Sequence, residues 1–278
     1  MKRLIPLLVV CTGYSLQAQI TRSPLSTLYT GIGAYSKKFT DAFSGAANQA
    51  ALAFITIPAA GVYGERRFML AELGNYAAAL AMPVKSGGAG LSLHYFGGGG
   101  FTTSQLGLGY GRRLSDKAGI GAQINYNTMQ VPGYGNAGTL NFELGTLWHI
   151  SEKIHVGIHL YNPVGGKYGK GGAEKLASVY TAGAGYEASD VFFIGAVLAK
   201  EEDQPAGLQL GLQYLFAKQL LARGGIATTG SNCFLGIGVK WKTARVDAVT
   251  NWHPQLGFTP ALQLLFDLKE KKEEEPMP

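Results

Sequence analysis

The sequence predicts an all-β protein, a transmembrane antiparallel up-and-down β-barrel of about 14 strands preceded by a short N-terminal plug or hatch segment. Three observations predict this class. Apolar side chains alternate with glycine or polar side chains along most of the chain, tight turns alternate with longer loops, and aromatic residues recur just before the tight turns. The alternating segments have the length that a tilted strand needs to cross a membrane.

The stretch from Gln105 to Thr128 shows the alternation most clearly. Leu106, Leu108 and Tyr110 alternate with glycine, and after a polar turn apolar residues alternate with glycine, glutamine and asparagine. Successive strand side chains point to opposite faces, so each segment has one apolar face and one bare or polar face. The second face carries too little charge for the exterior of a soluble β-protein, which is the alternative class. In a membrane barrel it faces the lumen while the apolar face meets lipid.

The two ends of the chain predict the compartment. Residues 1–18 read as a secretory signal peptide, with Lys2 and Arg3 before a short apolar run and a small-residue cleavage point at Ala18. Cys11 lies inside this run without the small preceding residue of a lipoprotein site, which argues against a lipid anchor. Residues 269–278 combine mixed charges with prolines and predict a disordered tail.

Residues 19–60 do not alternate and include a small, helix-tolerant stretch, so we expect a plug or hatch there; a lead-in that packs nowhere is the alternative. Residues 61–268 form the predicted barrel. Its expected strands lie at 61–71, 74–83, 88–97, 101–113, 117–129, 138–150, 153–161, 176–187, 190–200, 205–216, 218–228, 232–242, 244–252 and 257–268, with twelve strands as the alternative count.

Turn lengths predict the orientation of the barrel. The tightest turns are Ser115-Asp116, Ser151-Glu152, Ala188-Ser189, Ala217 and Thr243, whereas the connections at 130–137 and 162–175 are the longest. Outer-membrane barrels have short periplasmic turns and longer external loops. We therefore expect the chain in the cell outer membrane with both termini in the periplasm.

Aromatic residues mark the expected membrane boundaries. The predicted periplasmic girdle consists of the residues just before the tight turns, Tyr110, Trp148, Tyr186, Tyr214 and Trp241. The residues near the opposite strand ends, Tyr95, Phe101, Tyr126, Tyr161 and Trp252, are the candidates for an outer girdle. The alternative is that these aromatics are core residues of a soluble sheet. In that case their positions would not depend on whether the next turn is short or long.

Composition and spacing argue against several kinds of site. A formal charge of +6, scattered along the chain, does not favour nucleic-acid binding. Cys233 is the one cysteine after the signal, so no internal disulfide or thiolate metal site is expected. His155 and His159 lie on one predicted strand, roughly 13 Å apart, which argues against a metal site. No catalytic, cofactor or metal residues are predicted, although a triad assembled across distant strands remains the enzymatic alternative.

Charged residues on the predicted inner face suggest a lumen cluster. Its candidate members are Glu143, Arg223, Lys240, Arg245 and Asp247. Buried charges need partners, so the favoured interpretation is a salt-bridge network that braces the wall and docks the plug. The alternative is a polar gate below an apolar lumen.

The order of these features resembles the PorV/PorQ group of Bacteroidota outer-membrane proteins, which are related to FadL-like fatty-acid transporters. The resemblance covers nearly the whole mature chain. The stretch from Ala46 to Ala53 is similar to the family's Asn-Pro-Ala-x-Leu hatch motif. Asn48 matches the asparagine, Gln49 stands where proline is usual, and Leu52 completes the candidate hatch residues.

The resemblance implies a non-catalytic barrel with outer-membrane lipid around it. PorV-like members act as partners of the type IX secretion apparatus, whereas FadL-like members pass hydrophobic molecules. Because the predicted external loops are small, we expect an accessory or structural barrel associated with secretion-system or other envelope proteins. Transport of a hydrophobic small molecule is the alternative, and the sequence names neither a substrate nor a partner.

Overall fold

The computed structural model describes residues 29–33, 35–37, 40–133, 135–169, 174–228 and 232–268. The predicted signal peptide at 1–18, with Cys11, and the predicted tail at 269–278 lie outside these ranges. Within them, no helix is both long and apolar enough to span a membrane.

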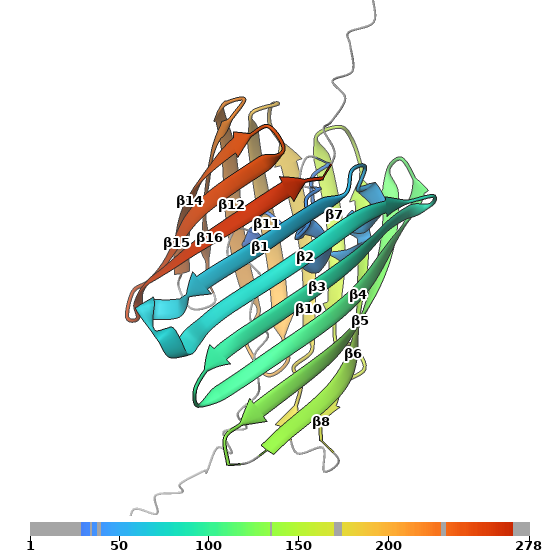
Figure 1. Ribbon diagram of the computed structural model, residues 1–278. Coiled ribbons are helices and arrows are strands. Elements are labelled where there is room, and N and C mark those ends of the chain that lie inside the picture. Colours follow the sequence, from blue (N-terminus) through green and yellow to red (C-terminus); the bar gives the residue numbers. More distant parts are fainter. Residues whose placement is uncertain are drawn as a thin grey trace, which may run out of the picture.

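Fourteen antiparallel strands form a closed barrel, and the chain visits them in order (Figure 1). Closure comes from β1, which pairs with β2 on one side and with β16 on the other. The helical turns and strands are α1 (Ser44–Ala47), η2 (Gln49–Phe54), β1 (Ala59–Arg66), η3 (Arg67–Met69), η4 (Ala71–Leu73), β2 (Gly74–Val84), β3 (Gly87–Gly98), β4 (Phe101–Ser115), β5 (Ala118–Val131), β6 (Gly135–His149), β7 (Ile154–Tyr161), β8 (Lys167–Tyr168), β9 (Glu174–Lys175), β10 (Val179–Glu187), β11 (Phe192–Glu201), β12 (Gly207–Ala217), β13 (Leu220–Ala227), β14 (Asn232–Trp241), β15 (Ala244–His253) and β16 (Gly257–Asp267).

Side chains alternate between the two faces of the wall as the sequence predicts. On β4, Leu106, Leu108 and Tyr110 are exposed on the outside, whereas Gly107 and Gly109 are buried on the inside. Apolar side chains cover the outer surface of the other strands in the same way. Such a surface suits lipid and not water, so the predicted transmembrane barrel is confirmed as the fold.

Apart from the end of β1, every strand limit lies within three residues of its predicted position. β6 begins at Gly135 and not at residue 138, so the predicted long connection at 130–137 is wrong and only three residues separate β5 from β6. β1 ends at Arg66 and not at residue 71, because Phe68 and Met69 have left-handed backbones (φ 53° and 63°) that no strand continues through. β10 begins at Val179 because the chain leaves the wall after Tyr161, and the described part of this connection contains the paired strands β8 and β9.

This connection also corrects the predicted outer girdle at one position. Tyr161 is 2% exposed and packs with Tyr168 and Leu176 in an apolar cluster inside the long loop. It faces inward because it continues the alternation of β7, in which His155, Gly157 and His159 are buried on the same face. Tyr95, Tyr126 and Trp252 are exposed on the outer surface, as expected for girdle residues.

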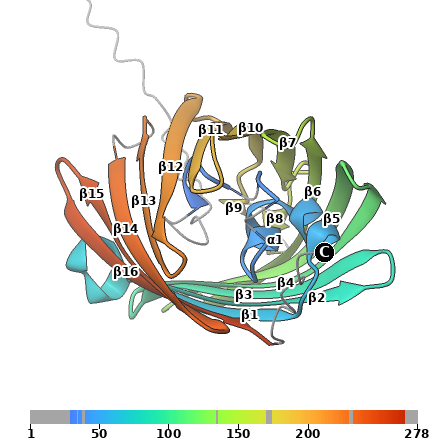
Figure 2. The same ribbon diagram turned by 90° about the horizontal axis from the view of Figure 1, so that it is seen from above.

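The segment before the barrel lies inside it. Figure 2 shows α1 within the ring of strands. We call residues 40–58 the plug, the barrel end that carries the β4–β5 and β6–β7 turns the short-turn end, and the opposite end the long-loop end. In the plug, η2 packs mainly against β4 and β5, close to their short turn.

Candidate functional site

Glycines on the inner wall allow the plug to approach the strands closely. A Cβ atom added to Gly121 would lie 2.3 Å from the backbone carbon of Gln49, and one added to Gly111 would lie 2.4 Å from Ala53 N. Real Cβ atoms cannot come this near to a backbone, so any side chain at either glycine would push η2 away from the wall. The inward glycines of β4 and β5 therefore form a seat for the plug.

Asn48 forms the bend between α1 and η2. Its backbone is extended (φ −157°, ψ 117°), and its side-chain oxygen accepts a hydrogen bond from Ala50 N at 3.0 Å. The side-chain nitrogen donates to the carbonyl oxygens of Thr146 (3.2 Å) and Ile158 (3.3 Å). One buried amide therefore caps η2 and ties the plug to β6 and β7.

Gln49 binds a buried carboxylate on the wall. Its Nε2 donates to Glu143 Oε2 at 2.7 Å, and His159 Nε2 lies 2.8 Å from the same oxygen. The other oxygen, Glu143 Oε1, accepts from Asn125 Nδ2 at 2.7 Å and from Gln123 Nε2 at 3.3 Å. Glu143 is fully buried, and these donors offset the loss of its hydration. We call this group the Glu143 network.

Leu52 is the third predicted hatch residue, and it serves as an apolar contact. It is 2% exposed and clusters with Ile55 of the plug and Ala81 of β2. Its side chain lies over the inward faces of Gly90 and Gly109, where an added Cβ would come within 3.0 and 3.1 Å of it. The three hatch residues thus contact the wall by different means: backbone bonds, a carboxylate and apolar packing.

A second polar group joins the plug to β15 and β16. Arg245 Nη2 lies 3.2 Å from Asp41 Oδ2 of the plug, and Arg245 Nε lies 2.9 Å from Asp247 Oδ2. Gln263 Nε2 also approaches Asp247 Oδ2, at 3.4 Å. Tyr29 Oη donates to Asp41 Oδ1, and burial together with the charge of Asp41 keeps the pKa of this phenol well above its usual value. We call this group the Arg245 network.

The predicted lumen cluster is therefore split. Arg223 is buried, bonds to Gln213 Oε1 at 2.6 Å and lies within electrostatic reach of Arg245 and Asp247, so these three come together. Glu143 instead belongs to its own network on β6. Lys240 is at the rim, where its half-exposed amine lies 3.5 Å from Asp267. Lys240 does not belong to the cluster because it is the second-to-last residue of β14, at the water-exposed end of the strand.

Sequence reasoning missed the plug's own contributions. No role was predicted for Asp41 from the sequence. It could have been found, because an acidic residue in a segment that is expected to dock on inward arginines is a natural partner for them. The histidine partners were also missed, because they come from neighbouring strands. His155 Nε2 lies 3.0 Å from Glu187 Oε1, which also accepts from Ser36 Oγ, and His149 Nδ1 lies 2.9 Å from His155 Nδ1.

This histidine group does not have the order of a catalytic triad. The carboxylate of Glu187 lies between Ser36 and His155, whereas a nucleophilic serine needs the imidazole between itself and the acid. In the described part of the chain, no three His, Cys, Asp or Glu side chains are grouped as metal ligands.

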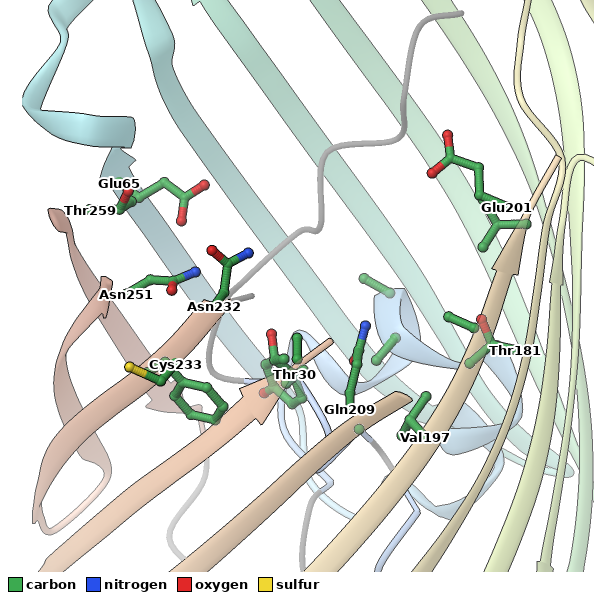
Figure 3. A pocket seen from close by; sticks show the side chains of 18 of the residues that line it. Thr30, Glu65, Thr181, Val197, Glu201, Gln209, Asn232, Cys233, Asn251 and Thr259 are labelled. Atoms are coloured by element: carbon green, nitrogen blue, oxygen red, sulfur yellow. The ribbon is translucent and has the colours of Figure 1, made fainter. Parts of the chain in front are cut away.

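A cavity of about 500 Å³ lies in the lumen between the plug and the long-loop end. Its floor is apolar and includes Tyr35, Phe43 and Ala46 from the N-terminal segment. Polar side chains from strands on opposite sides of the barrel also line it (Figure 3), namely Glu65, Thr181, Glu201, Gln209, Asn232, Asn251 and Thr259. Glu65 and Glu201 lie nearest the mouth, whereas Gln209 lies near the floor, where its oxygen accepts from Gly31 N at 3.1 Å.

The five predicted periplasmic girdle residues all lie on the outer surface. Tyr110, Trp148, Tyr186, Tyr214 and Trp241 are exposed, and each precedes a short turn. Tyr110 Oη also hydrogen-bonds with Ser86 of the neighbouring short turn. Their position suits the boundary between lipid and water, and their role there stays a prediction.

Solved structures with a similar fold include a channel, a FadL homologue and a transporter. The CymD monoaromatic hydrocarbon channel has 12% identity and a TM-score of 0.64, over 89% of this chain and 97% of that one. A Pseudomonas aeruginosa FadL homologue has 12% identity and a TM-score of 0.62, over 86% and 96%. The Ralstonia pickettii toluene transporter TbuX has 9% identity and a TM-score of 0.56, over 88% and 96%.

Sequence comparisons found no relative: no protein-family model matches, and no curated protein matches either. At these identities the structural likeness shows the fold, a FadL-like barrel, and nothing finer. The comparisons lend more support to the predicted alternative, a channel for hydrophobic compounds, than to a PorV/PorQ-like accessory barrel, and none of them supports type IX secretion.

Proposed function

We propose that the protein is an outer-membrane channel that takes hydrophobic small molecules into a cavity above an N-terminal plug. The observation that carries this proposal is the cavity itself, a space of about 500 Å³ with an apolar floor inside a closed barrel. Ligand sites of this size hold molecules comparable to a small drug or a substituted aromatic ring. The fold likeness to a hydrocarbon channel and a toluene transporter supports the same function.

The way the plug is held fits a part that moves during transport. It contacts the wall through hydrogen bonds, an ion pair and side-chain packing, and residues 40–58 contain no cysteine that could cross-link them to the strands. Each of these contacts is replaceable by water when the segment shifts. A molecule in the cavity rests on Phe43 and Ala46, which belong to the plug and would move with it.

The orientation follows from the position of the cavity. It opens toward the long loops, which face outward in outer-membrane barrels, whereas the plug sits next to the short turns. We propose that both termini are periplasmic. A hydrophobic molecule then meets the polar mouth first, the apolar cavity second and the plug last.

Uptake by intact Gram-negative cells tests the channel function. Cells with the protein should accumulate labelled toluene or benzyl alcohol faster than cells with an empty vector. Ala199→Trp, on the cavity wall of β11, should remove most of this gain because an indole fills the space. Leu198→Trp, on the outer face of the same strand, is the matched control and should leave uptake unchanged. Uptake equal to that of empty-vector cells for both compounds would refute the proposal.

An accessory role in secretion is the second candidate, and the close seating of the plug favours it. An obstructed short-turn end suits a barrel that serves as a partner more than as a conduit. Affinity purification from detergent-solubilised outer membranes separates the two candidates. Recovery of the barrel with a stable set of envelope proteins supports the accessory role, and recovery of the barrel alone opposes it.

A further inference from the structure

We propose that the cavity selects neutral molecules that combine a compact apolar body with one hydrogen-bond donor, such as a hydroxyl group, and that Asn251 recognises the donor. This inference rests on the proposed channel function, because it names the substrate class of the same cavity. It is carried by the place of Asn251 on the wall, by its hydrogen bonding and by the charges around the mouth.

Asn251 lies where the inner wall changes from apolar to polar. On β15 the inward positions pass from Asp247 in the Arg245 network to Val249, which is 6% exposed in an apolar cluster, and then to Asn251. Across the ladder, Asn251 pairs with Phe234 on β14 and with Thr259 on β16. An apolar ring on one side and a hydroxyl on the other place this amide at the boundary.

The apolar side of this boundary suits a ring or a short branched chain. Phe43 of the plug and Phe234 of β14 belong to one buried cluster, and both line the cavity. Val197 lines the cavity from β11 on the facing wall (Figure 3). These side chains give an apolar body a place to lose its hydration.

The polar side holds an acceptor without a donor. The side-chain oxygen of Asn251 is buried, and no group in the described ranges donates a hydrogen bond to it. The neighbouring Thr259 hydroxyl already accepts from Phe68 N at 3.0 Å. A buried acceptor left unpaired costs free energy. The oxygen is closed off from the cavity in this conformation, so a ligand hydroxyl bonds to it only after the half-buried amide turns toward the cavity.

The charges at the mouth disfavour an anion. Two carboxylates, Glu65 and Glu201, line the cavity there. The nearby guanidinium of Arg67 lies 3.0 Å from Glu65 Oε1 and stacks 5.2 Å over the ring of Phe96, so it is engaged by the wall. The same ion pair offsets the charge of Glu65, so the negative charge that a carboxylate ligand would meet at the mouth is that of Glu201. A neutral donor meets no such barrier.

A series of ring compounds of similar size tests the proposal. Equilibrium dialysis of the full-length protein in detergent, corrected for binding to the detergent alone, would compare toluene, benzyl alcohol, benzoate and benzylamine. We expect benzyl alcohol to bind on the order of tenfold more tightly than toluene, because only the alcohol donates to the buried acceptor. Benzoate should bind most weakly. Tightest binding of benzylamine would overturn the proposal in favour of the carboxylates.

The variant Asn251→Leu should remove the preference for the alcohol while toluene binding is kept or improved. Thr250→Val, the next residue on β15 with its side chain on the outer face, is the matched control and should keep the preference. Equal binding of toluene and benzyl alcohol to the unmodified protein would sink the proposal even if Asn251→Leu failed to fold. Uptake of both compounds at equal rates would leave the channel function standing, whereas uptake of neither would remove the function itself.

Discussion

Single side chains hold the plug in place through partners on the wall. Asp41 depends on Arg245, and Gln49 depends on Glu143. Removing one member of a buried pair leaves the other without compensation for its lost hydration, so the cost exceeds the value of the contact itself. The two networks are therefore the positions where a single substitution should change the plug most.

Removing the cation of the Arg245 network should destabilise the protein strongly. Arg245→Ala leaves Asp41 and Asp247 facing each other without the cation between them. We expect a loss of about 3 kcal/mol in the free energy of unfolding, measured by denaturant titration in detergent. The control, Lys240→Ala, removes a half-exposed ion pair and should cost less than about 1 kcal/mol. Equal effects would show that the network does not hold the plug.

The exchange of proline for glutamine in the hatch motif has a separate consequence. Asn48 keeps the extended backbone that precedes a proline, and position 49 begins η2, where proline is tolerated. Gln49→Pro should therefore keep the bend but remove the amide donor to Glu143, at a cost of about 1–3 kcal/mol in the free energy of unfolding.

Gln49→Met is the control for that substitution, since it removes the same donor without fixing the backbone. If both variants lose the same free energy of unfolding, the loss comes from the hydrogen bond between Gln49 and Glu143. A variant Gln49→Pro that is as stable as the unmodified protein would contradict the proposed contact.

At the scale of elements, the plug depends on the barrel, and the barrel does not depend on the plug. α1 and η2 have four and six residues, too few to be stable as isolated helices. They owe their conformation to the glycine seat and the caps on the wall. The strands, by contrast, pair continuously around the circle, beginning at Ala59, without using any plug residue.

Deletion of residues 19–57 should therefore leave a folded barrel with an open lumen. Removing the plug exposes the inner wall at the short-turn end to water, so ion conductance across planar bilayers should rise severalfold over that of the full chain. Resistance to unfolding by detergent at room temperature reports whether the barrel has formed. An unchanged conductance of a folded deletion variant would mean that the plug does not obstruct the lumen.

At the scale of the whole molecule, one face of the wall meets lipid, the other encloses a cavity, and the longest connection, between β7 and β10, lies at one end. The cavity opens at the long-loop end, and the plug with its two networks lies at the short-turn end. A substrate can therefore pass from the cavity to the plug in the inward direction only if every barrel is inserted in the membrane in one sense, with the long-loop end outside.

Surface labelling of intact cells checks that sense. An epitope inserted at Gly133, in the connection between β5 and β6, should be accessible to antibody from outside. The same epitope at Asp116, in the short β4–β5 turn, should be accessible only after the outer membrane is broken. Labelling of Asp116 on intact cells would reverse the proposed orientation and place the termini outside.

The sequence by itself determined the barrel, its strand count and the direction of nearly every side chain. These are local properties, because an alternation with period two and a turn length can be read without knowing any distant contact. It also identified Asn48, Gln49 and Leu52 as one segment and the inward face of Arg245 and Asp247. The end of β1 was not readable, because the left-handed backbones of Phe68 and Met69 leave no periodic pattern. The inward position of Tyr161 does follow from the alternation of β7 with His155 and His159, so its assignment to the outer girdle was wrong on the pattern itself.

Only the tertiary structure decided which inward residues share a network. Glu143 and Arg245 both face the lumen, but closure of the barrel places them against different parts of the plug, so Gln49 meets one and Asp41 the other. The cavity was likewise beyond sequence reasoning, because it is the space left after residues from eight or more segments come together around the plug. Strand direction follows from neighbours in the chain, whereas contacts across the lumen follow from the curvature and closure of the whole sheet.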